Sequence, residues 1–383
     1  MEKVFSEVDK LNEKYIGFLK DVATLESPTD FKEGVDACGR YFIDRAKELG
    51  FSVEVEKMER SGDAVCITMN ENAAGVPISI SGHIDTVHPV GLFGEEPVKI
   101  EGDIMHGPGV GDCKGGVVAG FMAMEALKNI GFKDRPVKLI LQTDEENSSE
   151  TSNKATVRFI CEKAKDSVAM LNVEPSNKNS DVVIERKGIA KYKVVIKGVA
   201  AHASICFKDT AASAIAEAAH KILKIEKFKD KEGITANVGL ISGGTAINTV
   251  PAECVLMVDT RYKTDEQLKE IETFMENLSK ESTIKGTTTE ITRINLRLSM
   301  PKIERNISLM KKVNDILLKA GLEELKEKVT FGGSDAADFT HFGIPVLDQL
   351  GIICEGTHTI NERVDLKSLP YCAKRIAAIV MNL

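Results

Sequence analysis

The sequence predicts an α/β protein in which a domain with a mostly parallel sheet, flanked by helices, is interrupted by an inserted α+β domain. Three observations lead to this prediction. Short apolar runs alternate with amphipathic helical stretches in the first half of the chain. A central block then has the order β-α-β-β-α-β of a ferredoxin-like unit. The α/β pattern resumes after Met300-Pro301, so we expect the interrupted domain over 1–187 and 298–383 and the insert over 188–297.

Helices and strands of the interrupted domain follow from periodicity and end signals. Apolar residues at helical spacing predict helices over Val4–Leu25, Phe31–Leu49 and Gly115–Ile130, the last two followed by glycine. Short apolar runs predict buried strands at 65–69, 77–80, 137–141 and 168–173. After the insert, we expect a helix over Ile307–Ala320, a strand over Pro345–Leu350 and a final helix over Leu366–Met381.

The insert is predicted to form a complete domain by itself. Strands are expected at Tyr192–Ile196, Ile234–Ile241, Cys254–Arg261 and Thr289–Leu298, with one helix from about Asp209 or Thr210 to Ile225 and another after the Thr264 cap. Three successive small domains are the alternative. We favour the insertion, because the outer pieces are each too short to cover a sheet.

Composition excludes some classes of function. The 383 residues include 50 Lys and Arg against 58 Asp and Glu, a formal net charge of −8, and 43% are apolar. This length fits about two globular domains. The acidic balance argues against a nucleic-acid partner, which requires clustered basic residues.

The same survey argues against a membrane partner. No apolar run approaches the roughly 18–20 residues that span a bilayer. The first ten residues carry charges where a secretory signal is apolar. We therefore expect a cytoplasmic protein, whose eight scattered cysteines, without a CxxC pair, are reduced thiols.

Polar residues that suit metal binding follow the predicted strands. His83 and Asp85 alternate after the strand ending near Ile80, so they point to the same side, as a ligating imidazole and a supporting carboxylate would. A single such pair is weak evidence. Asp112 follows a glycine-rich stretch before a helix, and the alternative is that it only caps that helix.

Further carboxylates follow two other strands. Asp144-Glu145-Glu146 ends one apolar strand, and a solvated acidic turn is the alternative for this segment. Glu174 ends the next strand, and His358 lies in a polar loop after the last one.

Together these residues predict two metal ions at the edge of one parallel sheet, where α/β proteins place their sites. One ion would be held by His83, Asp112 and Glu174, and the other by Asp112, Glu146 and His358. Mixed imidazole and carboxylate ligands favour two Zn²⁺ per chain, with Co²⁺ or Mn²⁺ as alternatives.

The motifs resemble the di-zinc metallopeptidase family that includes glutamate carboxypeptidase, peptidase T, aminoacylase, acetylornithine deacetylase and succinyl-diaminopimelate desuccinylase. The resemblance rests on five ordered motifs over essentially the whole chain, of which the loops Phe331–Ala337 and His358–Val364 are most similar to the glutamate carboxypeptidase and peptidase T branches. The motifs are His83-Ile84-Asp85, Gly109–Gly116, Asp144-Glu145-Glu146, Glu174-Pro175 and His358.

The resemblance implies roles for these residues. Asp112 would bridge the ions, Asp85 would support His83, and Glu145 would be the general base for a water bridging the metals. It also implies a cis peptide bond between Asp112 and Cys113. One departure, Asn147-Ser148-Ser149 in place of a glycine-containing stretch, could alter the pocket.

The insert and a late loop add candidate residues by the same resemblance. His202 would stabilise the oxyanion, often from a partner subunit, which makes the insert a lid and dimerisation domain and the protein a homodimer. The alternative for His202 is packing against its own sheet. Asn248 and Arg261 match positions that hold a substrate carboxylate, although an arginine at a strand end is usually just solvated. Gly333 and Ser334 would line the same pocket.

The expected function is therefore hydrolysis of an amide bond by a zinc-dependent exopeptidase acting on short peptides with a free carboxylate. A deacylase of N-acyl amino acids using the same chemistry is the main alternative. A non-catalytic binding protein of this fold and a two-metal phosphoesterase are further alternatives. The intact Glu145 and the lack of a basic cluster near the motifs argue against these two.

Overall fold

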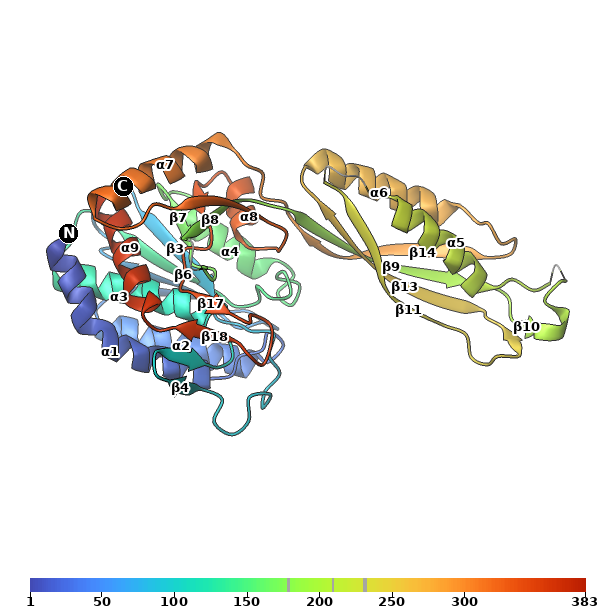
Figure 1. Ribbon diagram of the computed structural model, residues 1–383, viewed down its shortest axis with the longest axis horizontal. Helices are drawn as coiled ribbons and strands as arrows, with labels where there is room; N and C mark the ends of the chain where they lie inside the picture. The colour runs from blue at the N-terminus through green and yellow to red at the C-terminus, as the bar shows by residue number, and fades with distance from the viewer. Residues whose placement is uncertain (178–179, 209, 230–232) are drawn as a thin grey trace. The chain divides into compact units, whose positions relative to one another are not determined.

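The computed structural model describes residues 1–177, 180–208, 210–229 and 233–383 (Figure 1). The chain forms two compact units. The first comprises Met1–Glu185, Lys302–Val329 and Ser334–Leu383, and the second comprises Arg186–Pro301 and Thr330–Gly333. The predicted insert, 188–297, lies within the second unit. The sequence did not suggest that Thr330–Gly333 belongs there. This segment lies beside the start of the insert, where the Lys187 N–H donates to the Thr330 carbonyl oxygen at 3.3 Å.

A six-stranded sheet forms the centre of the first unit, in the order β1-β2-β6-β3-β7-β16. The neighbours β6, β3, β7 and β16 are parallel, and β1 and β2 add an antiparallel edge. The mostly parallel sheet predicted from the sequence is therefore confirmed. The strands are β1 (Ser52–Glu56), β2 (Ala64–Met69), β3 (Ile78–His83), β6 (Val137–Gln142), β7 (Met170–Asn172) and β16 (Val346–Leu347).

Helices cover both faces of this sheet. On β6, Lys138 Nζ donates to the Lys163 carbonyl oxygen of α4, whereas the next residue, Leu139, lies against Gly120 of α3. Successive side chains of a strand point to opposite faces, so α3 and α4 lie on opposite sides. The helices are α1 (Glu2–Thr24), α2 (Lys32–Glu48), α3 (Lys114–Asn129), α4 (Ala155–Ala164), α7 (Glu304–Lys319), α8 (Ala336–His341) and α9 (Ser368–Asn382).

Smaller sheets complete the first unit. An antiparallel sheet has the order β17-β18-β5-β4, and β15 (Lys326–Thr330) pairs with β8 (Asp181–Arg186). The expectation that His358 follows a strand of the parallel sheet is wrong, because His358 lies between β17 and β18. These short strands are β4 (Lys99–Glu101), β5 (Ile104–His106), β17 (Cys354–Glu355) and β18 (Arg363–Asp365).

The second unit has the predicted β-α-β-β-α-β order and an antiparallel sheet, β11-β13-β9-β14. Its main elements are β9 (Gly188–Lys197), α5 (Ala214–Lys227), β11 (Thr235–Gly243), β13 (Glu253–Tyr262), α6 (Asp265–Lys280) and β14 (Thr288–Arg297). Two short strands, β10 (Ala201–His202) and β12 (Thr249–Val250), pair with each other, and a 3₁₀ turn follows at Ala203–Ile205.

The helix α5 begins later than predicted. Ser213 caps it, because its hydroxyl accepts the Ala216 N–H at 3.2 Å. The predicted start at Asp209 lies outside the described residues.

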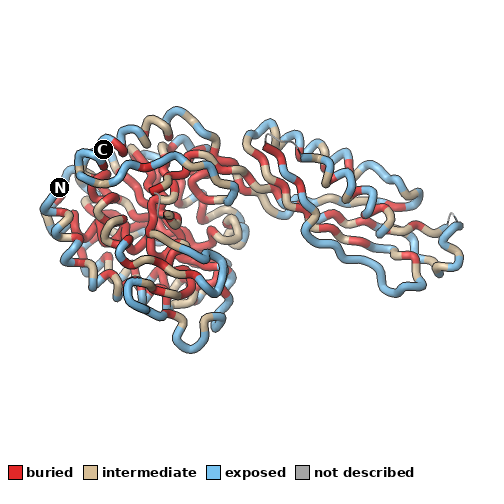
Figure 2. Tube along the Cα trace, viewed as in Figure 1, coloured by how far each residue is buried: buried red, intermediate tan, exposed pale blue. Residues whose placement is uncertain are grey.

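Each unit buries a hydrophobic core of its own (Figure 2). In α1 the predicted apolar face is confirmed, since Val4, Val8, Leu11, Tyr15 and Val22 are all buried. Among the described residues, no helix combines the length and apolar character needed to cross a membrane.

Candidate metal centre

Two sets of ligand-type side chains meet at Asp112, and each uses a different carboxylate oxygen. Asp112 Oδ1 lies 3.1 Å from His83 Nε2, which is also 3.8 Å from Glu174 Oε1. Asp112 Oδ2 lies 3.2 Å from His358 Nε2, which is also 3.2 Å from Glu146 Oε2. The five predicted ligands therefore form two sets that share one carboxylate.

These spacings fit two metal ions. Imidazole nitrogens and carboxylate oxygens bind Zn²⁺ at about 2.0–2.1 Å, so two ligands of one tetrahedral ion lie about 3.3 Å apart. Three of the four separations are 3.1–3.2 Å and the fourth is 3.8 Å. These four separations are compatible with one ion on each side of Asp112.

Asp112 is free for this role because it does not cap the following helix. α3 has Cys113 at its N-cap position and no side-chain cap hydrogen bond. Gly116, in the first turn of α3, lies against β7, and a Cβ there would be 1.9 Å from the Val173 carbonyl oxygen. This close approach brings Asp112 next to Glu174. The Asp112–Cys113 peptide bond is cis, as the resemblance implied.

Asp85 arranges three of the site residues. Its backbone oxygen lies 3.0 Å from His83 Nδ1, which fixes Nδ1 as the protonated nitrogen and leaves Nε2 for a metal. The buried Asp85 carboxylate accepts the N–H groups of Glu145 and Glu146 at 3.1 and 3.2 Å. It also accepts the Thr29 hydroxyl at 2.7 Å. Asp85 is therefore a positioning residue in this structure.

Because the site residues are buried, their negative charges must be balanced by bound protons or by metal ions. It raises the pKa of Glu146 to about 7 and that of Glu174 well above its ordinary value, with repulsion from Glu145 adding to both shifts. Hydrogen bonds to Asp112 and Glu146 raise the pKa of His358 to about 11. Without a metal the site therefore holds protons on its imidazoles and carboxylates, and divalent cations would take their place as the protons leave.

A thiol missed by the sequence reasoning lies in the same cluster. Cys113 Sγ, His83 and Glu174 are close enough to hold one ion together. The thiol donates to the Val173 carbonyl oxygen at 3.1 Å, and burial raises its pKa well above the ordinary value. Cys113 is therefore a neutral thiol beside the ligands, and the oxygen and nitrogen donors remain the better set.

Glu362 is a further residue that the sequence reasoning missed. Its fully buried carboxylate accepts the N–H groups of Gly109, Gly111 and Asp112 at 3.0–3.2 Å. His88 Nε2 lies 2.7 Å from the same carboxylate. Because Glu362 follows His358 by four residues, it ties the loop of one ligand to the backbone of the shared ligand. An acidic residue four positions after His358 is visible in the sequence, but nothing there shows that its carboxylate is buried against these N–H groups.

Replacing Glu362 with Gln is expected to weaken metal binding. The amide has one acceptor oxygen, and its NH₂ group faces backbone N–H donors, so the support of Asp112 is lost. Changes of this kind cost about 10–100-fold in metal affinity. Competition against a chelating dye measures the dissociation constants. Glu355→Gln, on exposed β17, is the matched control and should leave them unchanged; equal constants for both variants would contradict the positioning role.

The second unit brings His202 and Asn248 together. β10 pairs with β12, and the Ala203 N–H donates to the Asn248 carbonyl oxygen at 2.9 Å. His202 is exposed, and its Nδ1 accepts the Ser204 N–H at 3.2 Å. Neutral His202 therefore carries its proton on Nε2, which is free to donate to a ligand.

Arg261 lies at the other end of this sheet. It lies seven positions along β13, about 23 Å of extended strand, from Cys254, which is near β12. Asp259 binds the Nε and Nη2 side of the guanidinium at 2.7 and 3.1 Å, and Nη1 donates to the Phe331 carbonyl oxygen at 3.0 Å. Two of the five N–H donors, on Nη1 and Nη2, remain for a ligand.

The other two predicted pocket residues lie in different surroundings. The Gly333 carbonyl oxygen accepts from Arg186 Nη1 at 3.0 Å, and a Cβ at this glycine would lie 2.1 Å from Arg297 Cδ. Ser334 is fully buried, and its hydroxyl accepts Asn172 Nδ2 at 3.0 Å and the Ala336 N–H at 3.2 Å. Ser334 thus faces the protein interior here.

Comparison with known proteins identifies a family and a fold. The sequence model of peptidase family M20/M25/M40 matches residues 79–382. Carboxypeptidase G2 of Pseudomonas sp. (strain RS-16) is 28% identical over 371 residues, covering 95% of this chain and 88% of that protein. Succinyl-diaminopimelate desuccinylase of Helicobacter pylori (strain HPAG1) is 26% identical over 332 residues, covering 82% of each.

Solved structures share the fold over almost the full length. A tripeptidase from Staphylococcus aureus superposes with a TM-score of 0.80 at 21% identity, covering 96% of this chain and 97% of that one. Aminopeptidase PepT from Bacillus cereus gives a TM-score of 0.78 at 21% identity, covering 97% and 98%.

Proposed function

Because the chain belongs to peptidase family M20/M25/M40, we propose that it is a di-zinc hydrolase that cleaves an amide bond in short peptides with a free carboxylate. The observation that carries this proposal is the sharing of Asp112 between two ligand sets through its two oxygens. Structural zinc sites favour thiolates and closed coordination, whereas these mixed sets leave room for water and substrate.

The residues around the ligands supply the proton transfers. Bound metal ions would lower the pKa of a water and polarise the amide carbonyl. Glu145 is nine-tenths buried, and its backbone is held by Asp85 beside the ligand Glu146. In the proposed reaction the Glu145 carboxylate takes a proton from the attacking water and returns it to the leaving nitrogen. Repulsion from its carboxylate contributes to the raised pKa of both Glu146 and Glu174, which supports a position near both ligand sets.

Arg261 is proposed to bind the free carboxylate of the substrate. Asp259 holds one edge of the guanidinium and so orients the Nη1 and Nη2 groups, each with one remaining donor. A fixed, planar pair of donors suits a carboxylate. Asn248 is proposed to contact the substrate through its side-chain amide.

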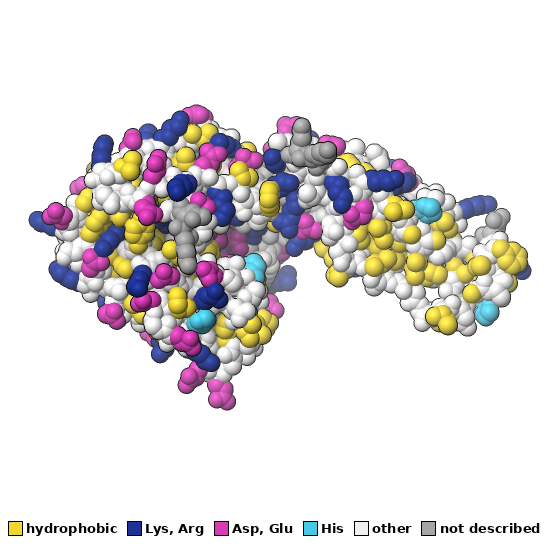
Figure 3. All heavy atoms as spheres, viewed as in Figure 1, with side chains coloured by type: hydrophobic (Ala, Val, Ile, Leu, Met, Phe, Trp, Pro, Cys, Tyr) yellow, Lys and Arg dark blue, Asp and Glu magenta, His cyan; other side chains and the backbone are white. Residues whose placement is uncertain are grey.

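We also propose a homodimer formed through the second unit. β11 is an edge strand, and its Leu240 and Ile241 side chains are 68% and 56% exposed. On the neighbouring α5, Leu223 is 62% exposed. Figure 3 shows hydrophobic side chains gathered over these elements. An exposed apolar edge strand is a surface for pairing with another chain, and two copies of β11 would pair about a two-fold axis.

The dimer would also explain where His202 acts. The ends of the inserted segment, at β9 and β14, lie at the Arg261 end of the sheet. His202 and Asn248 lie at the opposite end, a full strand length away. A partner subunit is therefore the proposed source of the His202 and Asn248 that complete each site.

A substrate panel tests the proposed reaction. The panel contains a dipeptide, a tripeptide and an N-acyl amino acid, with hydrolysis followed by release of free amine and zinc measured on the same samples. We expect hydrolysis of the peptides with about two zinc ions per chain. Preference for the N-acyl amino acid would favour the deacylase alternative, which the similarity to a desuccinylase keeps open. Zinc without hydrolysis of any of these would contradict the proposal.

The Arg261→Ala variant tests whether Arg261 binds the free carboxylate of the substrate. We expect KM for peptides with a free carboxylate to rise about tenfold or more with a smaller change in kcat, because a charge-assisted hydrogen-bonded pair is lost. Amidated peptides serve as the matched substrates, since they lack the group that Arg261 binds. An equal rise in KM for both would contradict the clamp.

A further inference from the structure

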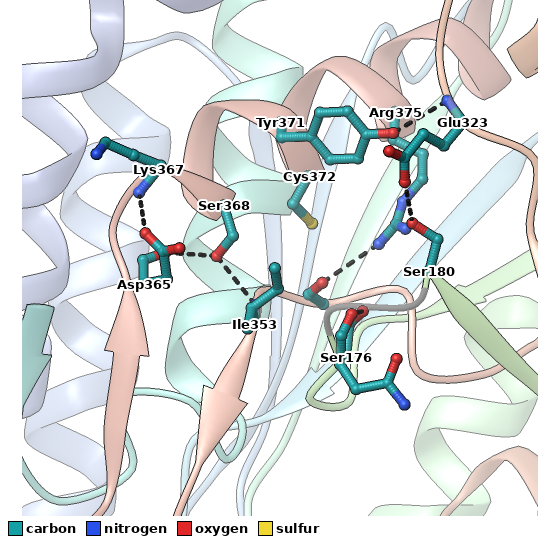
Figure 4. Close-up of a pocket in the computed structure, with 12 residues that line it drawn as sticks. Ser176, Ser180, Glu323, Ile353, Asp365, Lys367, Ser368, Tyr371, Cys372 and Arg375 are labelled. Carbon is teal, nitrogen blue, oxygen red and sulfur yellow. Dashed lines mark hydrogen bonds between the residues drawn. The ribbon is translucent and has the colours of Figure 1, made fainter. Parts of the chain in front are cut away.

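A cavity in the first unit lies among residues that the proposed reaction does not use. It has a volume of about 260 Å³ and is lined by residues of α9 together with Ser176, Ser180 and Ile353 (Figure 4). The residues that matter here are Ser176, Ser180, Glu323, Asp365, Tyr371 and Arg375. None of them is a predicted metal ligand, and the cavity is large enough for a small organic molecule.

Arg375 of α9 lines this cavity with a charge that has no acidic partner. The residue is only 3% exposed, and Nη2 donates to the carbonyl oxygens of Leu350 and Gly351 at 2.6 and 3.2 Å. Nε is buried without a hydrogen-bond acceptor. Among the described residues, no carboxylate forms an ion pair with Arg375. A buried guanidinium that is left in this state is costly, and an anion in the cavity would remove the cost.

Tyr371 provides a neutral donor on the same wall. Its hydroxyl oxygen accepts the Glu323 N–H at 3.1 Å, which leaves the hydroxyl proton for another acceptor. Ser176 donates only at 3.2 Å to the carbonyl oxygen of the next residue, so it can turn toward a better acceptor. The wall therefore presents one guanidinium and hydroxyl groups together.

The acidic residues of the cavity limit the charge of its ligand. Glu323 accepts the Ser180 hydroxyl at 2.9 Å, and Asp365 accepts the Lys367 N–H at 3.0 Å. The Lys367 ammonium also lines the cavity, but it is paired with Asp103 at 2.5 Å. These two carboxylates repel a multiply charged group such as phosphate. A single carboxylate carries one negative charge and matches the planar guanidinium.

We propose that this cavity binds a small molecule through one carboxylate group, held by Arg375 and by the Tyr371 hydroxyl. The site is separate from the metal centre, and it does not depend on which substrate the enzyme cleaves. Its size suits a molecule no larger than a free amino acid or a short carboxylic acid.

Binding of trifluoroacetate to the metal-loaded full chain, followed by ¹⁹F line broadening, tests the site. Trifluoroacetamide is the matched neutral probe. Tyr371→Phe is the main variant, because Arg375 also holds the turn whose Gly351 N–H donates to the Glu174 carbonyl oxygen. Tyr41→Phe controls for loss of a tyrosine hydroxyl elsewhere, and every variant is made in an Arg261→Ala background, which removes the proposed substrate clamp.

The expected pattern is specific. Tyr371→Phe weakens trifluoroacetate binding severalfold and Arg375→Met roughly tenfold or more, as for loss of a neutral and a charged hydrogen bond. In this background Tyr41→Phe binds as the unchanged chain does, acetate displaces the probe, and trifluoroacetamide does not bind. Equal binding by Tyr371→Phe and the unchanged chain would overturn the proposal even if Arg375→Met fails to fold. Stronger displacement by inorganic phosphate than by acetate would overturn the carboxylate assignment.

Discussion

Glu145→Gln is expected to lower kcat by about a hundredfold to ten-thousandfold while both metal ions stay bound. The amide has the shape of the carboxylate but cannot accept the proton of the attacking water. Glu145 belongs to neither ligand set, and its N–H contact with Asp85 does not depend on the side chain. Steady-state hydrolysis and metal analysis of the same preparation measure the two quantities.

Two variants of the same loop distinguish loss of the base from loss of a metal ligand. Glu146→Gln removes a ligand, so it should lose metal as well as activity. Glu150→Gln exchanges an exposed glutamate that pairs with Lys154, and it should retain both. If Glu145→Gln instead turns over substrate at the original rate, or loses metal as Glu146→Gln does, Glu145 is not the base.

His202→Ala is expected to lower kcat by about a hundredfold to a thousandfold, as for loss of one oxyanion donor. The Nε2–H group is free to donate because Nδ1 is occupied by the Ser204 N–H. Metal content should not change, since His202 is not a ligand. His202→Gln keeps a side-chain N–H and is expected to recover part of the rate.

Mixed dimers show whether His202 acts across subunits. A dimer of one Glu145→Gln chain and one His202→Ala chain contains one site with both residues intact if His202 comes from the partner. Random mixing should then restore roughly a quarter of the original activity, because half of the dimers are mixed and each has one intact site. If activity does not recover after mixing has been verified, His202 does not act on the partner's site. An active monomer found by light scattering would lead to the same conclusion.

Much of the fold followed from local patterns. The helical face of α1 and the βαββαβ order of the insert were predicted because their hydrophobic periods are long and regular. Short strands were harder to predict. β17 and β18 have two and three residues, so no period is detectable, and the sheet that carries His358 was missed. The start of α5 depended on which polar residue caps it.

The candidate ligands could be predicted individually, but most of their supporting contacts could not. His83, Glu146 and Glu174 follow strands of one parallel sheet, a rule that sequence order can apply. Asp85 was predicted to support His83, but its contacts with the N–H groups of Glu145 and Glu146, like those of Glu362 with Asp112, are brought about by the fold, and no spacing in the sequence marks them. The same holds for Cys113, whose neighbours are set by the packing of α3 against β7.

The sequence by itself determined the class of fold, the insertion, and the residue types that suit two metal ions, because periodicity and motif order are properties of the chain. Only the tertiary structure decided that Asp112 offers one oxygen to each ligand set rather than capping α3. It alone placed His202 a strand length from Arg261 and left Arg375 buried without an acid. These features arise where segments far apart in the chain meet, and close packing there fixes distances that local sequence does not contain.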